Sequence, residues 1–214
     1  MRTRLVLASS SPRRAQLLRE AGIPFVQVEP GVDDAELTPA VGLSAAAWAM
    51  ALAYLKARSA MRCMAAAQER TVWLGADTLV VLADGSIVGK PADEAEARAT
   101  LERLAGAEHR VLTAVALLRC DAEERDRPCV RRLFVDEAVV RLGRLGEEAI
   151  EEHVASGRWR GRAGGYNYAQ QRDLGWPLAC EGDEATVVGL PMRKLPAWLA
   201  VFSSGRCAQT LESR

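Results

Sequence analysis

The chain has 214 residues, in which 28 Lys and Arg balance 28 Asp and Glu. This length is enough to bury a substantial core, and we predict a single globular domain over residues 1–214. The charge balance excludes a general basic field for nucleic acid, which binds through many phosphates, but leaves a local anion pocket open. The five cysteines are scattered and form no C-x-x-C pair. They argue against a disulfide framework or a zinc site and predict a reducing cytoplasm.

The longest apolar stretch, GLSAAAWAMALAYL, ends just before Lys56. It is shorter than the roughly 18 to 20 residues that span a bilayer, so we interpret it as a buried helix. The N-terminal run RLVLAS is too short for a signal-peptide core and continues into a capped helix. We therefore expect no targeting segment and no membrane partner.

The N-terminal part predicts a strand, a helix, a strand and a second helix. The first strand covers residues 5–8, and a helix over residues 12–21 follows the N-cap Ser11. PFVQVEP is a second extended segment, and an acidic loop leads to a helix over residues 45–60 that Ser44 caps.

TVWLGADTLVVLADGSIVGKP contains two β-rich runs around Asp84-Gly85, which predicts a hairpin. A two-residue loop at these positions places Asp77 opposite Ala92. Lys90 then lies on the same face as Asp77, one diagonal step away.

The remaining segments continue the alternation of helices and strands. DEAEARATLERLAG and GEEAIEEHVASG predict helices, and RVLTAVALLR and RRLFVDEAVVRL predict strands that flank a charged hairpin tip at residues 121–130. After the loop-rich RWRGRAGGYNYAQQRDLGWP, ATVVGLP predicts a last strand and RKLPAWLAVF a last helix, which Pro196 should kink or shorten. This pattern predicts an α/β fold, a mixed β-sheet with flanking helices.

Arg13 and Arg14 fall in the first turn of the first helix, beside unpaired backbone N–H groups where acidic residues are usual. This placement predicts an anion at the helix start, with exposed arginines paired to acids as the alternative. Asp77 lies close to Gly75, where we expect the strand to end. The apolar residues of this strand predict that both of its faces are buried.

A buried carboxylate must be paired or bind a metal, so Asp77 and the helix start would suit magnesium and a polyphosphate. A satisfied structural carboxylate is the alternative for Asp77. By default Lys90 would be an edge-strand gatekeeper and Lys56 a snorkelling surface lysine. With only His109 and His153 in the chain, a histidine-based zinc centre is disfavoured.

Several segments together resemble, in order and spacing, the Maf family of nucleoside triphosphate pyrophosphatases. They are LASSSPRRAQLL, LAYLKA, GADTLVV, GKPADEAEA, LxxLAGxxHxVxTAVAL and EGDxxTVVGLPM, and they cover nearly the whole chain. The resemblance implies hydrolysis of a nucleoside triphosphate to monophosphate and diphosphate, with Mg²⁺ or Mn²⁺ as cofactor. It also implies two lobes around a cleft, as in inosine triphosphatases, and a homodimer.

The resemblance implies a role for individual residues. Asp77 matches the catalytic aspartate, which also holds the metal. The implied phosphate-handling residues are Ser9, Arg13, Arg14, Lys56 and Lys90. A metal-site glutamate in a V-D-E sequence of the family falls at Asp34 here, with Glu36 as a nearby substitute.

Base selection is implied by three positions. Arg13 and Thr78 match the branch that resembles dTTP and UTP pyrophosphatases, whereas the 7-methyl-GTP branch has a tryptophan before its paired arginines and a glutamine after the aspartate. The glutamine of the family's A-G-A-Y-G-I-Q-G corresponds to Gln170 after a shift of one residue in AGGYNYAQ. Tyr166 and Tyr168 would either stack on a base or pack a loop or dimer contact.

We therefore predict metal-assisted hydrolysis at the α-phosphorus of a pyrimidine or modified nucleotide, with Asp77 as metal ligand and general base. The alternatives are a 7-methyl-GTP pyrophosphatase and a non-catalytic nucleotide-binding regulator of cell division. A P-loop enzyme is excluded because the chain has no G-x-x-x-x-G-K-[ST] sequence.

Overall fold

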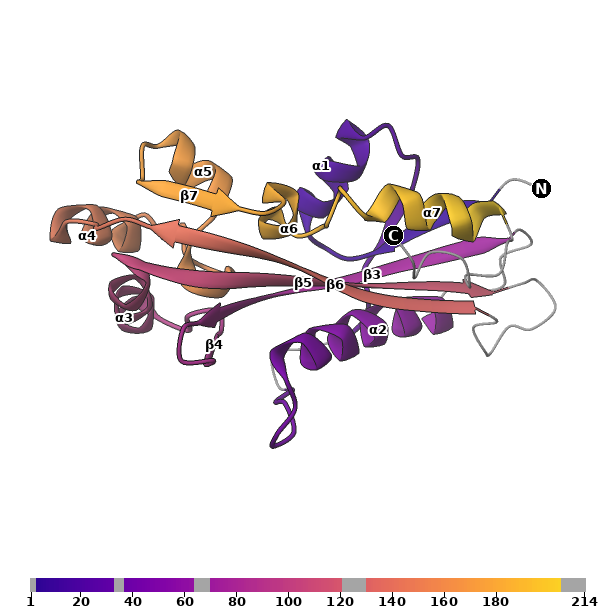
Figure 1. Cartoon of the computed structure of the whole chain (residues 1–214), viewed down its shortest axis with the longest axis horizontal. Helices are drawn as coiled ribbons and strands as arrows, with labels where there is room; N and C mark the ends of the chain where they lie inside the picture. The colour runs from indigo at the N-terminus through magenta and orange to yellow at the C-terminus, as the bar shows by residue number, and fades with distance from the viewer. Residues whose placement is uncertain (1–2, 33–36, 64–69, 121–129, 205–214) are drawn as a thin grey trace. The chain divides into compact units, whose positions relative to one another are not determined.

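The computed structural model describes residues 3–32, 37–63, 70–120 and 130–204 (Figure 1). The strands are β1 (Arg4–Ala8), β2 (Val26–Val28), β3 (Thr71–Leu82), β4 (Ile87–Val88), β5 (Ala107–Cys120), β6 (Val130–Leu142) and β7 (Leu178–Glu181). The helices are α1 (Pro12–Glu20), α2 (Ala45–Cys63), α3 (Glu94–Leu104), α4 (Glu147–Ala155), α5 (Tyr168–Asp173), α6 (Glu184–Val188) and α7 (Leu195–Ser204). Residues Ala163–Gly165 form a short 3-10 helix.

The strands of the described residues form one seven-stranded sheet in the order β2-β1-β3-β5-β6-β7, with β4 paired to β3. β1 runs parallel to β2 and β3, whereas β4 and β7 run antiparallel to β3 and β6. The predicted α/β fold with a mixed sheet and flanking helices is therefore confirmed. The predicted hairpin tip between β5 and β6 lies outside the described residues.

The chain folds into two compact units. The first unit contains residues 1–77, 113–135 and 189–214, and the second contains residues 78–112 and 136–188. The long strands β3, β5 and β6 each contribute residues to both units. Two units agree with the two lobes that the family resemblance implies.

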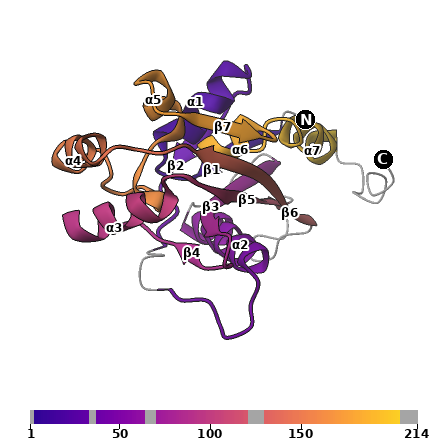
Figure 2. The same ribbon diagram turned by 60° about the vertical axis from the view of Figure 1, so that its left-hand side comes forward.

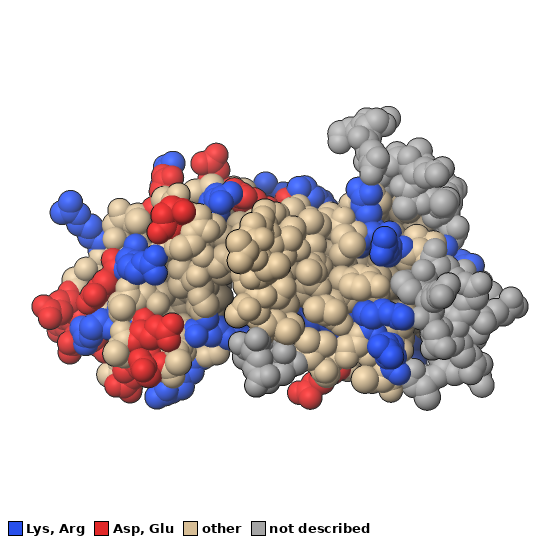
Figure 3. Space-filling view, turned by 90° about the horizontal axis from the view of Figure 1, so that it is seen from below, with Lys and Arg blue, Asp and Glu red and all other residues tan. Residues whose placement is uncertain are grey.

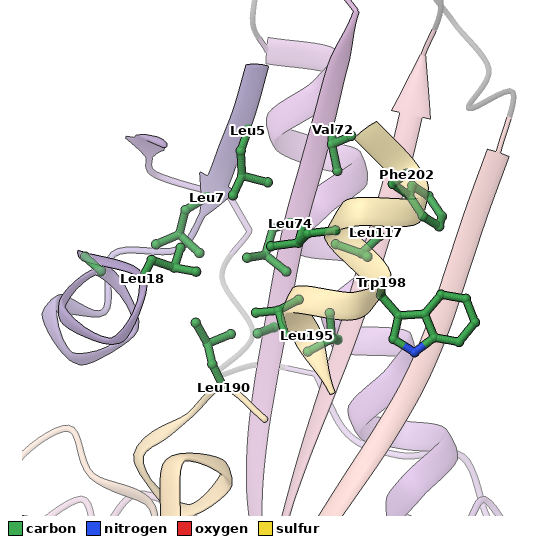
Figure 4. Packing of buried hydrophobic residues seen from close by; sticks show 14 residues of the cluster. Leu5, Leu7, Leu18, Val72, Leu74, Leu117, Leu190, Leu195, Trp198 and Phe202 are labelled. Carbon is green, nitrogen blue, oxygen red and sulfur yellow. The ribbon is translucent and has the colours of Figure 1, made fainter. Parts of the chain in front are cut away.

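In the first unit, helices cover both faces of β1 and β3. α2 lies on one side, and α1 and α7 lie on the other, in both views of Figures 1 and 2. The core between the sheet, α1 and α7 is formed by Leu7, Leu18, Leu74, Leu195 and Phe202, each exposed by 1% or less (Figure 4). Burial of such side chains is the main stabilising contribution in a domain of this kind.

Helix α1 begins and ends where the sequence predicts. The Ser11 side chain accepts the N–H of Arg14, Pro12 occupies the first helical position, and the chain passes through Ala21 to Gly22 with φ +65°. These residues provide hydrogen-bond partners for unpaired backbone groups at the helix ends and terminate the helix.

Helix α2 confirms the interpretation of the apolar stretch as a helix that packs on the protein. Its buried residues include Ala49, Leu52, Ala53 and Ala57. Figure 3 views the molecule from the α2 side, and a broad area near the middle of that face is formed by residues other than Lys, Arg, Asp and Glu. The helix has no charged residue before Lys56. Within the described residues, no helix combines the length and apolarity needed to cross a membrane.

In the second unit, α3 packs against α4 and against the 3-10 turn. The largest fully buried side chains here include Leu101 and Leu104 of α3, Leu142 of β6 and Trp159. Asp93 caps α3 by accepting the N–H of Glu96, as the acidic start of that segment predicts.

A hairpin around Asp84-Gly85 is confirmed, but the predicted register is wrong. Val80 pairs with Val88, which makes the loop one residue longer than predicted. Gly85 has φ +83°, the left-handed conformation that glycine takes in three-residue hairpin loops. The Asp84 carboxylate accepts the N–H of Ser86 at 2.8 Å and stabilises this turn.

The corrected register removes the predicted relation between Asp77 and Lys90. β4 ends at Val88, so its ladder with β3 does not extend to Lys90. A shift of one residue also exchanges which side chains of the two strands share a face. The hairpin therefore provides no common face for Asp77 and Lys90.

The predicted last strand, ATVVGLP, is also wrong, because its first residues form α6 and the strand β7 lies before it. The carbonyl of Asp183 accepts the N–H of Thr186 at 2.9 Å, and its side chain accepts the N–H of Ala185 at 3.1 Å. The buried Thr186 hydroxyl donates to Asp136 of β6 at 2.6 Å. These contacts outweigh the β propensity of the Thr-Val-Val run.

Two helices near the C-terminal end differ from the sequence pattern. α7 starts at Leu195, so Pro196 shortens the predicted helix at its start and lies in the first turn, where a missing N–H removes no helical bond. α5 was not predicted; Asn167 caps it by accepting the N–H of Gln170.

Candidate functional site

A largely buried ion pair joins helix α2 to strand β3 in the first unit. Lys56 Nζ lies 2.6 Å from Asp77 Oδ1, and the two side chains are 12% and 8% exposed. Burial of Asp77 is therefore confirmed, and its negative charge is compensated by an ammonium. The interpretation of Lys56 as a surface lysine is wrong. Asp77 also lies inside β3 rather than at a strand end, because the strand continues to Leu82.

Gly75 allows α2 to approach β3 closely enough for this pair to form. A Cβ atom on Gly75 would lie 2.2 Å from the Ala53 carbonyl oxygen and 2.8 Å from the Ala57 nitrogen. No side chain fits at that distance from a helix backbone. Gly75 lies two residues before Asp77 in β3, and the α2 residues nearest to it, Ala53 and Ala57, lie on either side of Lys56 in the sequence. The close approach of α2 and β3 therefore brings Lys56 and Asp77 together.

Gly75→Ala is expected to destabilise the protein by about 1–3 kcal/mol, because the added methyl forces α2 away from β3. The displacement should also lengthen the Lys56–Asp77 contact. Urea unfolding measures the first effect. Gly85→Ala serves as a comparison, since a Cβ there meets no atom within 4 Å although the positive φ adds strain. Equal stability of Gly75→Ala and the wild type would contradict the packing argument.

The start of α1 holds a second charged group in a fixed position. Arg14 is 9% exposed, its Nη1 donates to Ser9 Oγ at 3.1 Å, and its Nε donates to the Gly189 carbonyl at 3.0 Å. Ser9 Oγ also accepts the N–H of Ser11 at 3.2 Å. The exposed-arginine alternative is therefore wrong for Arg14, whereas Arg13 is half-buried.

The first turn of α1 contains no acidic residue. Its positive dipole end thus lies in the same turn as Arg13 and Arg14, an arrangement that favours an anion such as phosphate. The bonds of Arg14 to Ser9 and Gly189 fix its plane in advance, which reduces the entropy lost when a ligand binds.

Of the base-selection candidates, Arg13 lies in the first unit, and Thr78, Tyr166 and Gln170 lie in the second, as does the predicted phosphate ligand Lys90. Thr78 is half-buried and Lys90 is exposed. Gln170 is half-buried, and its Oε1 accepts a hydrogen bond from Nη1 of Arg162 at 2.9 Å. The contribution of each of these residues to substrate binding stays a prediction.

Both tyrosines of AGGYNYAQ are buried in the core of the second unit. The Tyr166 hydroxyl lies 3.0 Å from His109 Nε2, and burial raises the pKa of Tyr166 and lowers that of His109 to about 4. The Tyr168 hydroxyl donates to Glu184 at 3.4 Å. This packing is what the loop-packing alternative requires, and base selection by Tyr166 stays a prediction.

The proposed metal partners Asp34 and Glu36 lie outside the described residues. Among the residues that are described, no group of three His, Cys, Asp or Glu side chains could hold a metal ion. Asp77 nevertheless fits one ligand position, because its Oδ1 already binds a cationic group, the Lys56 ammonium, and hard carboxylate oxygens suit Mg²⁺ or Mn²⁺.

The pairing of Lys56 with Asp77 was not predicted, although the sequence carries a signal for it. Lys56 follows Ala49, Leu52 and Ala53 at the spacing of one helix face, and these three residues are buried. A lysine on the buried face of a helix needs a counter-charge, and β3 offers Asp77.

A family model and similar proteins of known name point to one family. Residues 4–202 match the family model described as Maf-like protein. A dTTP/UTP pyrophosphatase of Symbiobacterium thermophilum is 41% identical over 201 residues, which cover 92% of this chain and 93% of that protein. A dTTP/UTP pyrophosphatase of Pelotomaculum thermopropionicum is 38% identical, with 92% and 96% covered. The structure of a HAM1 protein from Coxiella burnetii aligns with TM-score 0.45 at 19% identity, over 94% of this chain and 99% of that one.

Proposed function

Because the chain belongs to the Maf-like protein family, we propose that it is a nucleoside triphosphate pyrophosphatase that hydrolyses dTTP or UTP to the monophosphate and diphosphate. The observation that carries this proposal is the buried Lys56–Asp77 pair in a chain 41% identical to a protein of that name. A protein that only binds nucleotides does not need a buried carboxylate.

In the proposed reaction the Asp77 carboxylate accepts the proton of the attacking water. Arg13, Arg14, Lys56 and Lys90 bind the phosphate oxygens and neutralise charge on the leaving diphosphate. A divalent cation, held by Asp77 together with Asp34 or Glu36, would supply Lewis-acid stabilisation of the phosphate charge. Attack by water and departure of diphosphate require no covalent enzyme intermediate.

The preference for dTTP or UTP is supported by the names of the relatives and by Gln170. Arg162 donates to the Gln170 carbonyl oxygen, which leaves the amide NH₂ group as a hydrogen-bond donor. Thymine and uracil present carbonyl oxygens that such a donor can recognise. Thr78 matches the same branch of the family, and 7-methyl-GTP remains the alternative substrate.

Diphosphate release by the purified protein tests this function. We expect turnover of dTTP and UTP in Mg²⁺ or Mn²⁺, slower turnover of CTP, 7-methyl-GTP and purine triphosphates, and loss of activity in EDTA that Mg²⁺ restores. Nucleotide binding without release of diphosphate from any of these triphosphates would favour the regulatory alternative instead.

The cellular location and the oligomeric state of the protein are also proposals. We propose a cytoplasmic location, because the five cysteines are scattered along the sequence and Cys63 is exposed without a disulfide. A homodimer is proposed on the family resemblance, and light scattering of the purified protein measures it.

A further inference from the structure

The loop that carries Lys90 lies against the turn at Gly164-Gly165. The Gly164 N–H donates to the Gly89 carbonyl at 3.1 Å. A Cβ on Gly165 would lie 3.5 Å from Pro91 Cγ, so the turn also lies beside Pro91. Both glycines have φ +74°, a conformation that other residues rarely adopt. The turn therefore binds the residue before Lys90 and lies next to the residue after it.

A buried histidine fixes this turn in place. His153 of α4 is 1% exposed, and its Nε2 lies 2.9 Å from the Gly165 carbonyl oxygen. A carbonyl only accepts, so Nε2 must carry the proton and donate. Its Nδ1 lies 3.1 Å from the side-chain nitrogen of Gln171, which is also 1% exposed. The imidazole is thus held as one neutral tautomer by a neighbour on each side.

A path of hydrogen bonds and one peptide link ends at Gly89, the residue before the exposed Lys90. It runs from Gln171 of α5 through His153 to Gly165, and the adjacent Gly164 binds Gly89. Lys90 itself is exposed, so the position of its backbone decides where its flexible side chain can reach. Buried polar side chains stabilise a core less than apolar ones of similar volume, which suggests a purpose beyond packing.

We propose that His153 and Gln171 are positioning residues that hold Lys90 where it meets the phosphates of the substrate. The proposal rests on the proposed function, in which Lys90 binds phosphate. It also gives the two neighbouring glutamines different roles. The buried Gln171 orients His153, whereas the half-buried Gln170 is the candidate for recognition of the nucleotide base.

A double-mutant cycle with Lys90→Met tests the proposal. In the wild-type background, His153→Leu is expected to lower kcat/KM by about 10-fold to 100-fold, the usual loss when a supporting residue is removed. In the Lys90→Met background the same change is expected to cost less than about twofold, because the lysine it positions is gone. His153→Gln, which keeps an amide donor, should recover part of the activity. An equal loss in both backgrounds would overturn the proposal.

Two further measurements separate positioning from stability and from the proposed function. Thr186→Val removes a different buried hydrogen bond of the second unit, and a similar loss of kcat/KM in that variant would overturn the proposal. Hydrogen exchange needs no turnover, and we expect faster amide exchange at Gly164, Gly89 and Lys90 in His153→Leu. If the wild type releases no diphosphate, the proposed function fails. If amide exchange at these residues is the same in His153→Leu and in the wild type, the positioning role of His153 fails, whether or not the wild type releases diphosphate.

Discussion

Asp77→Asn is expected to reduce kcat for diphosphate release by at least about 10²- to 10³-fold while the protein remains folded. The amide has the shape of the carboxylate, but it carries no charge and cannot accept the proton of the attacking water. The residue is 6% exposed and lies inside β3, so the substitution keeps the packing of the strand. Steady-state kinetics with dTTP and UTP measures the loss, and circular dichroism checks the fold.

Asp84→Asn provides the matched control for this substitution. Asp84 lies in the exposed hairpin turn after the same strand, where it accepts the N–H of Ser86. An asparagine there can accept the same bond, so wild-type turnover is expected. Normal turnover of Asp77→Asn with any triphosphate would remove Asp77 from the reaction. Loss of folding in Asp77→Asn alone would show that its charge is needed to neutralise Lys56.

Local sequence signals predicted those elements whose ends are determined by neighbouring residues. Ser11 and Pro12 at the start of α1 and Asp93 at the start of α3 are capping signals that act within one turn. The alternation of such elements was enough to predict a mixed α/β sheet. The same local signals misplaced the last strand, because the helix α6 is stabilised by the distant bond of Thr186 to Asp136.

The hairpin shows how a small local error changes a functional prediction. Asp84-Gly85 was correctly identified as a turn, but its loop is one residue longer than predicted. Because side chains alternate between faces, this shift reverses which residues share a face. The predicted patch of Asp77 and Lys90 depended on that register, whereas the contact of Asp77 with Lys56 depends on the packing of α2 on β3.

The candidate site was predictable in its residue types but not in its partners. The apolar residues around Asp77 predict that this aspartate is buried and needs a compensating positive charge. That Lys56 meets this need depends on Gly75, whose missing side chain allows the helix to approach. The support of Lys90 by His153 depends on chain segments that are far apart in sequence, and no local pattern indicates it.

Lys56→Met is expected to lower kcat/KM by at least about 10²-fold and to destabilise the protein by about 3 kcal/mol. Methionine fills a similar volume but leaves the buried Asp77 carboxylate without the ammonium that lies 2.6 Å away in the wild type. Urea unfolding in EDTA measures the loss of stability. Because a divalent cation bound at Asp77 supplies the missing positive charge, Mg²⁺ should stabilise Lys56→Met more than it stabilises the wild type.

Lys194→Met is the control for this prediction, because it removes the same charge from an exposed position of the first unit. It should unfold like the wild type in EDTA and in Mg²⁺. Equal effects of Mg²⁺ on Lys56→Met and on the wild type would mean that the cation does not bind at Asp77. A greater effect on Lys56→Met, lost again when Asp77→Asn is added, would identify Lys56 as the group that balances Asp77 until a metal ion binds.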